Sequence, residues 1–391
     1  KKIEVGQKVV VAEPGITIKN IDGKEIDIKK AKIRGIESEG MICAEDEIGI
    51  GNSHSGIIVL ENEAKVGDSA INYLKPINDT IFDISLTPNR ADAASHLGVA
   101  RDLKASTGEE IILPDISSFN NTNSSQVEIN INEEGACPRY AGCIIEGIEI
   151  KDSPSFIKDY LNAIGVKPIN NVVDITNFVL HGIGQPLHAF DLNNIKKNKI
   201  IVQYAKKNEK FITLDGEERK LNGEDLMICD GDGNPMCIAG VFGGEKSGVT
   251  NKTTKIFLES AYFNPSDIRT SSQNHQLKTD ASYRFERGID PNITIYALKY
   301  AASLICKYCK GSVTSKVFDI YPKKIDNHKV EFDIERINIL SGHNFKEDEI
   351  IKILKSLDIE TEKKGNTFTA DVPPFRVDVT READILEEIL R

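Results

Sequence analysis

The sequence predicts an α+β chain of several domains. Its 391 residues are enough for about two to four domains. The apolar content of 40% and the charged content of 28% are typical of globular domains. Strand-like segments dominate the first 75 residues, a mixed helix and strand pattern fills the centre, and a small mixed unit follows. No run approaches the ~20 apolar residues that a membrane span needs.

Residues 1–75 predict a small β-barrel that is truncated at its start. Val9–Ala12 and Ile16–Ile18 are strand-like, and Asp22-Gly23 is a hairpin signal. Short strands with glycine-rich turns are typical of small barrels. Three nearby cations, at Lys30, Lys32 and Arg34, are candidates for nucleic-acid phosphate contacts. The alternative, that they are solvated charges on a strand edge, is equally open.

Residues 76–125 predict a connecting helix. Leu86–Asp92 precedes a segment in which apolar residues from Ala94 to Ala105 recur at roughly helical spacing. The Asn- and Ser-rich stretch 117–125 is typical of a linker. Residues 126–325 then form the largest unit, a central α/β domain, and residues 326–391 a small α+β domain. Within the small domain we expect strands near 329 and 367–372 and helices at 347–357 and 380–390.

The central domain holds an unusual cluster of polar residues. Glu259 stands in an otherwise apolar or small run, where an ionised carboxylate needs a partner or its pKa rises. The segment 278–291 packs acidic and basic residues among small and aromatic ones. Upstream, four glycines fall within Gly240–Gly248, where the backbone can approach a ligand closely. These features predict a pocket, and the alternative is a paired structural network beside a loop.

A second cluster is acidic and lies near the end of the chain. Glu387 and Glu388 lie three and four residues after Asp384, which places them on one face of a helix, and Asp378 precedes all three. Like charges at that spacing destabilise a helix, so a cation is a natural partner, and carboxylate oxygens suit Mg²⁺. The alternative is a favourable interaction with the positive helix N-terminus, which accounts for Asp384 better than for Glu387 and Glu388.

Charge and cysteine usage limit the function. The formal net charge of −11 argues against a protein that binds nucleic acid through its overall charge, so local basic patches must do so. Seven scattered cysteines, with one C-x-x-C pair at Cys306 and Cys309, indicate reduced thiols and a cytoplasmic protein.

Three segments of the chain resemble the β subunit of bacterial phenylalanyl-tRNA synthetase, in the domain that edits mischarged tRNA. These segments are Phe257–Pro265, Lys278–Pro291 and Gly240–Gly248. The resemblance extends along nearly the whole chain. It implies an OB-fold tRNA-binding module truncated at its start (1–75), a linker and helix of a discontinuous N-terminal domain (76–125), an editing domain (126–325) and a winged-helix-like domain (326–391). We therefore expect a fragment of a larger protein.

The resemblance also implies a reaction. A phenylalanine pocket rejects the added hydroxyl of tyrosine poorly, and a second pocket that requires this hydroxyl corrects the error by hydrolysis of Tyr-tRNA(Phe). The residues implied as catalytic are Asn177, His188 and Glu259, with Glu259 as the acceptor of the phenol proton and the other two orienting water. The residues implied as substrate-binding are Thr176, Gly240, Gly243, Gly244, Thr279 and Ala281.

The implied partners are tRNA(Phe) and the α subunit, in a heterotetramer, with neither membrane nor DNA. The acidic residues Asp378, Asp384, Glu387 and Glu388 match a Mg²⁺ site shared with that subunit, and ATP is used only by the full enzyme. This chain alone is not expected to charge tRNA. Two alternatives are a non-catalytic tRNA-binding scaffold with an inactive editing pocket, and a metal-dependent hydrolase that uses the terminal acidic cluster.

Overall fold

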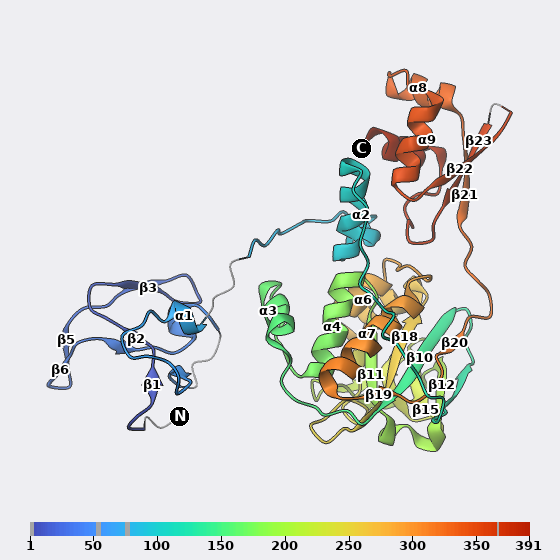
Figure 1. Ribbon diagram of the computed structural model, residues 1–391. Coiled ribbons are helices and arrows are strands. Elements are labelled where there is room, and N and C mark those ends of the chain that lie inside the picture. Colours follow the sequence, from blue (N-terminus) through green and yellow to red (C-terminus); the bar gives the residue numbers. More distant parts are fainter. Residues whose placement is uncertain (1–3, 52–55, 75–78, 366) are drawn as a thin grey trace. The chain divides into compact units, whose positions relative to one another are not determined.

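The computed structural model describes residues 4–51, 56–74, 79–365 and 367–391. The chain divides into two compact units, Lys1–Ile81 and Phe82–Arg391 (Figure 1). The mixed α+β character that the sequence predicts is confirmed, whereas the domain boundaries at 75, 125 and 325 stay predictions. No helix in the described ranges is long and apolar enough to cross a membrane.

The first unit consists of short antiparallel strand pairs. The pairs are β1 (Lys8–Val9) with β8 (Val59–Leu60), β2 (Val11–Ala12) with β7 (Met41–Ile42), β3 (Thr17–Lys19) with β4 (Glu25–Asp27), and β5 (Ala31–Ile33) with β6 (Ile36–Ser38). Gly23 turns the β3–β4 hairpin at a φ of 79°, a conformation that favours glycine, so the predicted Asp22-Gly23 turn is confirmed. Short helices η1 (Asp46–Ile48) and α1 (Ile71–Leu74) complete the unit. A closed barrel stays a prediction.

The central part of the second unit contains two five-stranded sheets. The first has the order β11 (Leu187–Asp191), β18 (Lys255–Tyr262), β10 (Arg139–Glu146) and β19 (Ser312–Val313), with β20 (Phe318–Ile320) also on β10. The second has the order β17 (Phe242–Gly243), β16 (Pro235–Ile238), β15 (Leu226–Asp230), β12 (Lys199–Tyr204) and β9 (Glu128–Ile131). A hairpin of β13 (Lys210–Ile212) and β14 (Glu218–Lys220) and the turns η3 (Leu192–Asn194) and η4 (Lys196–Asn198) accompany them.

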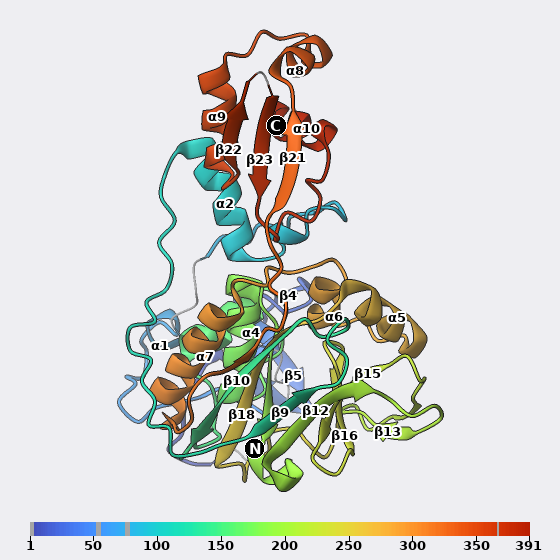
Figure 2. The same ribbon diagram turned by 90° about the vertical axis from the view of Figure 1, so that its right-hand side faces the viewer.

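The first sheet is buried on both faces. Successive strand residues point to opposite faces, so Phe257 of β18 joins the core between the two sheets, and Leu258 joins the core on the other side. That other side is covered by helices α4 (Asn171–Ile183) and α7 (Thr294–Cys309) (Figure 2), together with α3 (Ser155–Ala163). Helices α5 (Pro265–His275) and α6 (Asp280–Phe285) follow β18. Unbroken runs of buried residues in β10 and β18 are the consequence.

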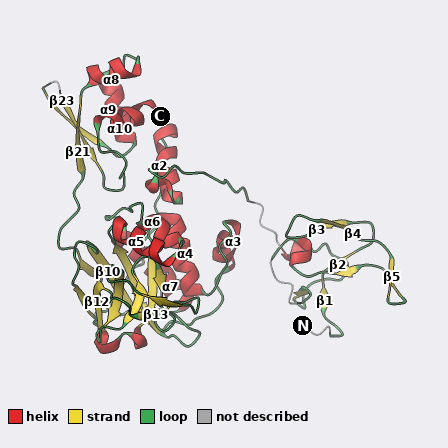
Figure 3. Cartoon of the chain, turned by 180° about the vertical axis from the view of Figure 1, so that it is seen from behind, coloured by secondary structure: helices red, strands yellow, loops and turns green. Residues whose placement is uncertain are grey.

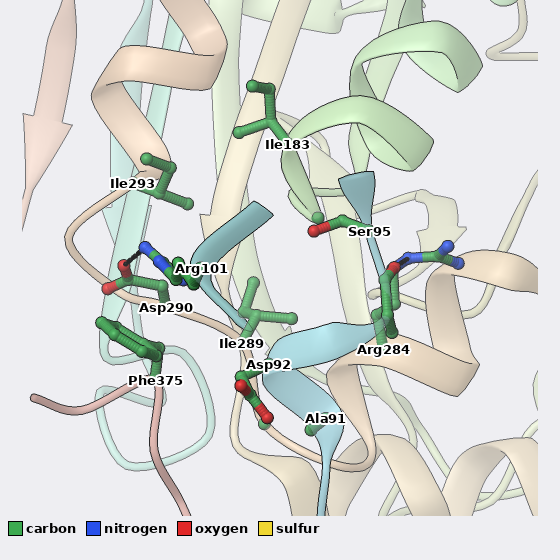
Figure 4. Close-up of a pocket in the computed structure, with 13 residues that line it drawn as sticks. Ala91, Asp92, Ser95, Arg101, Ile183, Arg284, Ile289, Asp290, Ile293 and Phe375 are labelled. Atoms are coloured by element: carbon green, nitrogen blue, oxygen red, sulfur yellow. Dashed lines mark hydrogen bonds and ion pairs between the residues drawn. The ribbon is translucent and has the colours of Figure 1, made fainter. Parts of the chain in front are cut away.

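The predicted connecting helix is confirmed as α2 (His96–Thr107), which follows the turn η2 (Ala91–Ala93). Ser95 caps its N-terminus by accepting the Gly98 amide at 3.0 Å. Arg101 forms an ion pair with Asp290 of the central domain at 3.6 Å, and its guanidinium lies 3.7 Å from the centre of the Phe375 ring. A cavity of about 30 Å³ lies among these residues (Figure 4). Helix α2 therefore packs on two neighbouring parts of the chain.

The stretch 117–125 is tied to the first sheet and is not a free linker. The Thr122 amide donates to the Val313 carbonyl at 3.1 Å, and the Ser125 amide donates to the Thr314 carbonyl at 2.8 Å. Asn and Ser composition predicts a loop, but it does not predict such backbone pairing with a distant strand.

The small domain at the end of the chain has a three-stranded sheet in the order β21 (His328–Phe332), β23 (Thr367–Val372) and β22 (Glu360–Lys364). Helices α8 (Ile334–Ser341), α9 (Glu347–Ser356) and α10 (Glu382–Leu390) pack with it (Figure 3). The predicted strands and both predicted helices are confirmed. Helix α8 and strand β22 are additions that the sequence pattern did not show. The winged-helix comparison stays a prediction.

Candidate functional site

Three strands of the first sheet meet at Glu259. In the antiparallel pairing, Glu259 of β18 lies opposite His188 of β11 on one side and opposite Gly142 of β10 on the other. Because directly opposite residues share a face, these side chains point into the space between the two sheets. The sequence-predicted pair His188 and Glu259 is therefore brought together by strand register.

Glu259 is a buried carboxylate. The residue is 5% exposed, and the hydroxyl of Tyr140 donates a hydrogen bond to its Oε2 at 2.5 Å. Burial raises the pKa of Glu259 to about 7, and the Tyr140 hydrogen bond opposes that rise. Burial also raises the pKa values of Cys137 and Cys237, with a smaller contribution from the Glu259 charge, so both thiols stay protonated. The carboxylate thus sits in a site that favours hydrogen-bond donors.

His188 is held as a neutral imidazole. Burial lowers its pKa to about 4, and its ring packs edge-on against Phe190 with ring centres 4.5 Å apart. The Nε2 atom is buried and has no hydrogen-bond partner among the described residues. A buried ring nitrogen without a hydrogen-bond partner destabilises the folded state, because it has lost its hydrogen bonds to water. This nitrogen is therefore available to a ligand or a water molecule.

The glycine turn meets the site at one position. A Cβ atom on Gly243 would lie 2.9 Å from His188 Cε1, so only glycine lets β17 approach the imidazole this closely. Gly240, at a φ of 64°, instead faces the core side chains Phe263, Ile268 and Phe285. Of the two, Gly243 lies at the site, and Gly240 is explained by core packing.

Gly244 lies at a neighbouring cavity. A Cβ on it would lie 2.7 Å from the Met236 carbonyl oxygen. The cavity has a volume of about 570 Å³, and its lining includes Lys196, Gly244 and Lys246. Volumes of this size accommodate small ligands. Gly244 is therefore close to a hollow of suitable size, on the turn that also carries Gly243.

The two α6 residues lie near the same turn. Thr279 caps the helix, and its hydroxyl donates to the Val241 carbonyl at 3.0 Å, which ties α6 to the glycine turn. Ala281 packs against the core between the two sheets. Both therefore belong to the side of the sheet that carries Glu259.

Thr176 and Asn177 lie on α4. The Thr176 hydroxyl donates to the Val173 carbonyl at 2.7 Å, and the buried residues of α4 pack against the opposite face of the first sheet. No hydrogen bond joins Asn177 to His188 or Glu259 within the described ranges. The hydrogen bond of the Thr176 side chain stays within α4, and the assignment of both residues stays a prediction.

The four terminal carboxylates gather around a cavity of about 220 Å³ that Asn89 also lines. Arg376 pairs with Asp378 at 3.1 Å and with Glu388 at 2.6 Å. Asp384 caps α10, accepting the Thr380 and Arg381 amides at 2.9 and 2.8 Å. The described residues include no group of three or more acidic, histidine or cysteine side chains arranged to hold a metal ion.

As arranged, the four carboxylates do not fit Mg²⁺, because Arg376 and Arg381 already pair with three of them. The guanidinium of Arg376 is almost fully buried between Asp378 and Glu388. Arg381 adds a further pair with Asp384 at 3.0 Å. A Mg²⁺ ion at this position would have to displace these pairs. The predicted metal assignment stays a prediction.

The three basic candidates of the first unit lie around the β5–β6 hairpin. Lys30 pairs with Glu39 at 2.6 Å. Lys32 is exposed on β5 opposite Glu37, and Arg34 is exposed at the turn with a φ of 50°. Lys32 and Arg34 are thus the better placed for a phosphate.

Tyr140 and Arg376 are the site residues that the sequence did not reveal. Tyr140 stands two residues before Gly142 on β10, which puts it on the Glu259 face of the sheet, but only the strand register establishes that. Arg376 lies between two prolines and an aspartate, with no local sign that it pairs with Glu388.

Three family models match the chain. A putative tRNA binding domain matches residues 1–69, a B3/4 domain matches residues 136–310, and a tRNA synthetase B5 domain matches residues 330–391. The site between the two sheets lies within the B3/4 match. These domains together define the class, which is that of aminoacyl-tRNA synthetases.

The particular family follows from the relatives. The chain is 47% identical over 395 residues to the phenylalanine–tRNA ligase beta subunit of Porphyromonas gingivalis, covering 100% of this chain and 48% of that protein. It is 48% identical over 397 residues to the beta subunit of Bacteroides fragilis, with coverages of 100% and 48%. The resemblance to the bacterial phenylalanyl-tRNA synthetase β subunit is confirmed, and the chain spans about half the length of these curated relatives.

One solved structure also aligns. An N-terminal fragment of the phenylalanyl-tRNA synthetase beta subunit from Pyrococcus horikoshii covers 78% of this chain and 84% of that chain, at 21% identity and a TM-score of 0.38. A score this low supports no detailed comparison of the two folds.

Proposed function

We propose that the central domain hydrolyses mischarged Tyr-tRNA(Phe) as the editing site of a phenylalanine–tRNA ligase. The observation that carries the proposal is the direct opposition of His188 and Glu259 across β11 and β18. One residue is a buried acceptor, and the other is a neutral imidazole whose Nε2 has no partner among the described residues. A tyrosyl ester carries both a phenol, which needs a hydrogen-bond acceptor, and an ester, which needs a group that orients water.

The chemistry divides between the two residues. An ionised carboxylate accepts hydrogen bonds only, so Glu259 favours the hydroxyl of a tyrosyl group over the bare ring of a phenylalanyl group. A site built to bond a hydroxyl discriminates strongly against the analogue that lacks it. A neutral imidazole can orient a water molecule and accept its proton as the ester is attacked. The ester needs no enzyme nucleophile, because it is already activated.

The rest of the proposed activity belongs to the larger enzyme. Aminoacylation would require the α subunit with ATP and Mg²⁺, and the proposed partners are that subunit and tRNA(Phe). The name of the matching N-terminal domain supports tRNA binding by residues 1–69. A substrate-binding role of Thr176, a catalytic role of Asn177 and a cytoplasmic location remain part of the proposal.

A non-catalytic scaffold is the second candidate. Two observations favour it: Glu259 already accepts the Tyr140 hydroxyl, and Asn177 has no hydrogen bond to the site in the described ranges. In that case the same domains would bind tRNA and assemble with the α subunit without hydrolysis.

Hydrolysis of charged tRNA separates these candidates. Tyr-tRNA(Phe) and Phe-tRNA(Phe) are incubated with this chain and with the complete two-subunit enzyme, and release of the amino acid is followed. We expect the complete enzyme to release tyrosine much faster than phenylalanine. Release of both at the rate of buffer alone would favour the scaffold.

A further inference from the structure

Tyr140 is a buried tyrosine whose hydroxyl meets a carboxylate. The residue is 0% exposed, and its hydroxyl donates to Glu259 Oε2 at 2.5 Å. Its ring lies nearly parallel to that of Phe257, with an interplanar angle of 7° and ring centres 6.4 Å apart. The hydroxyl of a buried tyrosine requires a partner, and Glu259 is the one found in the described part of the chain.

The position of the hydroxyl is fixed by packing. Gly142, two residues along β10 and directly opposite Glu259, has no side chain, and the Phe257 ring fills the space where a Cβ would lie. Phe257 and Tyr140 are both fully buried in the core between the sheets. The tyrosine ring therefore has no room to swing away from Glu259, and its donor is preorganised.

The other polar groups around Glu259 do not replace this donor. They come from the loop before β10, from β16 and from β11, and they are Cys137, Cys237 and His188. Burial keeps the thiols protonated and the imidazole uncharged. None brings a positive charge, so the strong hydrogen bond from Tyr140 is the contact that favours the ionised form of Glu259.

We propose that Tyr140 is a positioning residue for hydroxyl recognition: it holds one oxygen of Glu259, so that the carboxylate stays an acceptor and its other oxygen is presented to the incoming phenol. This inference rests on the proposed editing function. It goes further by naming the internal group that prepares the acceptor. Tyr140 touches no substrate itself.

The Tyr140→Phe variant tests the proposal through its pH profile. Removal of the hydroxyl takes away one charge-assisted hydrogen bond, so Glu259 is ionised only at higher pH. In the complete enzyme, the pH at which selectivity for Tyr-tRNA(Phe) over Phe-tRNA(Phe) is half developed should rise by about one unit. Because pH 7 is close to the pKa of Glu259 in the unmodified protein, selectivity at pH 7 should fall about fivefold.

A matched control is Tyr204→Phe. Tyr204 also donates to a carboxylate in the same domain, but that carboxylate is Asp267, at 2.9 Å, and not Glu259. The Tyr204→Phe variant should leave the pH profile of selectivity unchanged. If Tyr140→Phe does not fold, 3-fluorotyrosine placed at position 140 keeps the shape of the side chain and is a stronger donor, so it should move the midpoint to lower pH.

A second readout does not depend on hydrolysis. The Glu259 carboxyl is titrated by infrared difference spectroscopy, with Glu259→Gln identifying its band. A titration midpoint that is higher in Tyr140→Phe than in the unmodified protein supports the proposal. Equal midpoints would overturn it, whatever the enzyme does. Absence of hydrolysis by the unmodified complete enzyme would instead refute the editing function, and the infrared comparison would still decide the role of Tyr140.

Discussion

His188 lies directly opposite Glu259 in the antiparallel pairing of β11 with β18, so a neutral imidazole and a buried carboxylate share one face of the sheet. Strand register fixes this relationship, because a slip of one residue in either strand would place the two side chains on opposite faces of the sheet. The pairing connects the two halves of the proposed chemistry, recognition of a hydroxyl and activation of water.

Replacement of His188 by alanine should remove hydrolysis and leave folding intact. A positioned general base contributes about 10²- to 10⁴-fold to a rate, and a loss in this range is expected for Tyr-tRNA(Phe). Since burial lowers the pKa of His188 to about 4, its protonation should cause no inflection in the rate between pH 6 and 8. Single-turnover deacylation measures both effects.

His181→Gln is the matched control for this variant. His181 also has a pKa lowered to about 4 by burial, but it lies at the end of α4 beside Arg284. Its replacement should leave the hydrolysis rate close to that of the unmodified protein. A His188→Ala enzyme with full activity would remove His188 from the mechanism.

Stability should respond to pH through Glu259. Its pKa is about 7 in the folded protein against an ordinary value of 4.5, so the folded state binds the proton more tightly. The resulting stabilisation is complete below pH 4.5 and is lost as the pH rises through 7. Relative to Glu259→Gln, the unmodified protein should lose up to about 3 kcal/mol of unfolding free energy between pH 4 and 8. Urea unfolding at both pH values checks this, and parallel pH dependences would contradict it.

Mg²⁺ should bind this chain weakly. Arg376 already compensates Asp378 and Glu388, and Asp384 is engaged in capping α10, which leaves Glu387 as the freest carboxylate. Calorimetry should show affinity no tighter than roughly millimolar, the weak end of the range for sites built from oxygen ligands. Addition of the α subunit should tighten binding, and Glu387→Gln should abolish that gain. Micromolar binding by this chain alone would show that the site is complete within it.

Lys32 and Arg34 should contribute to tRNA affinity through charge. Each contact to a phosphate releases counterions, so each alanine replacement should reduce the slope of log affinity against log salt by about one unit. Lys30→Ala is the control, because Lys30 is already paired with Glu39 at 2.6 Å and should change the slope less. Filter binding of tRNA(Phe) at several salt concentrations gives the slopes. An unchanged slope in the double variant would mean that these residues are solvated surface.

The helices were accessible from the sequence because their signals are local. The spacing of Ile350 and Leu354 predicted α9, and the apolar recurrence from Ala94 to Ala105 predicted α2. Helix α8 was missed because it is short, and Ile337 is its one buried residue. Order within the sheets depends on pairing between distant strands, which no local pattern encodes.

Site residues could be predicted from the sequence only where the residue type is unusual for its local surroundings. The carboxylate of Glu259 stands in an otherwise apolar or small run, which predicts a perturbed pKa, and the structure buries this residue. Its partner Tyr140 carries no such local signal, because the hydrogen bond between Tyr140 and Glu259 depends on the register between β10 and β18. At Gly240 the structure adds a packing role that the sequence does not reveal, because a Cβ there would meet Phe263 and Phe285, and its substrate-binding role stays a prediction.

The most direct test of the account is the selectivity of Glu259→Ala in the complete enzyme. The ratio of the hydrolysis rates of Tyr-tRNA(Phe) and Phe-tRNA(Phe) is measured for this variant and for the unmodified enzyme under identical conditions. Loss of a buried acceptor for the phenol should cost about 1–3 kcal/mol of discrimination, a fall in the ratio of roughly 5- to 150-fold. An unchanged ratio in a folded Glu259→Ala enzyme would contradict the assignment of Glu259 as the group that recognises tyrosine.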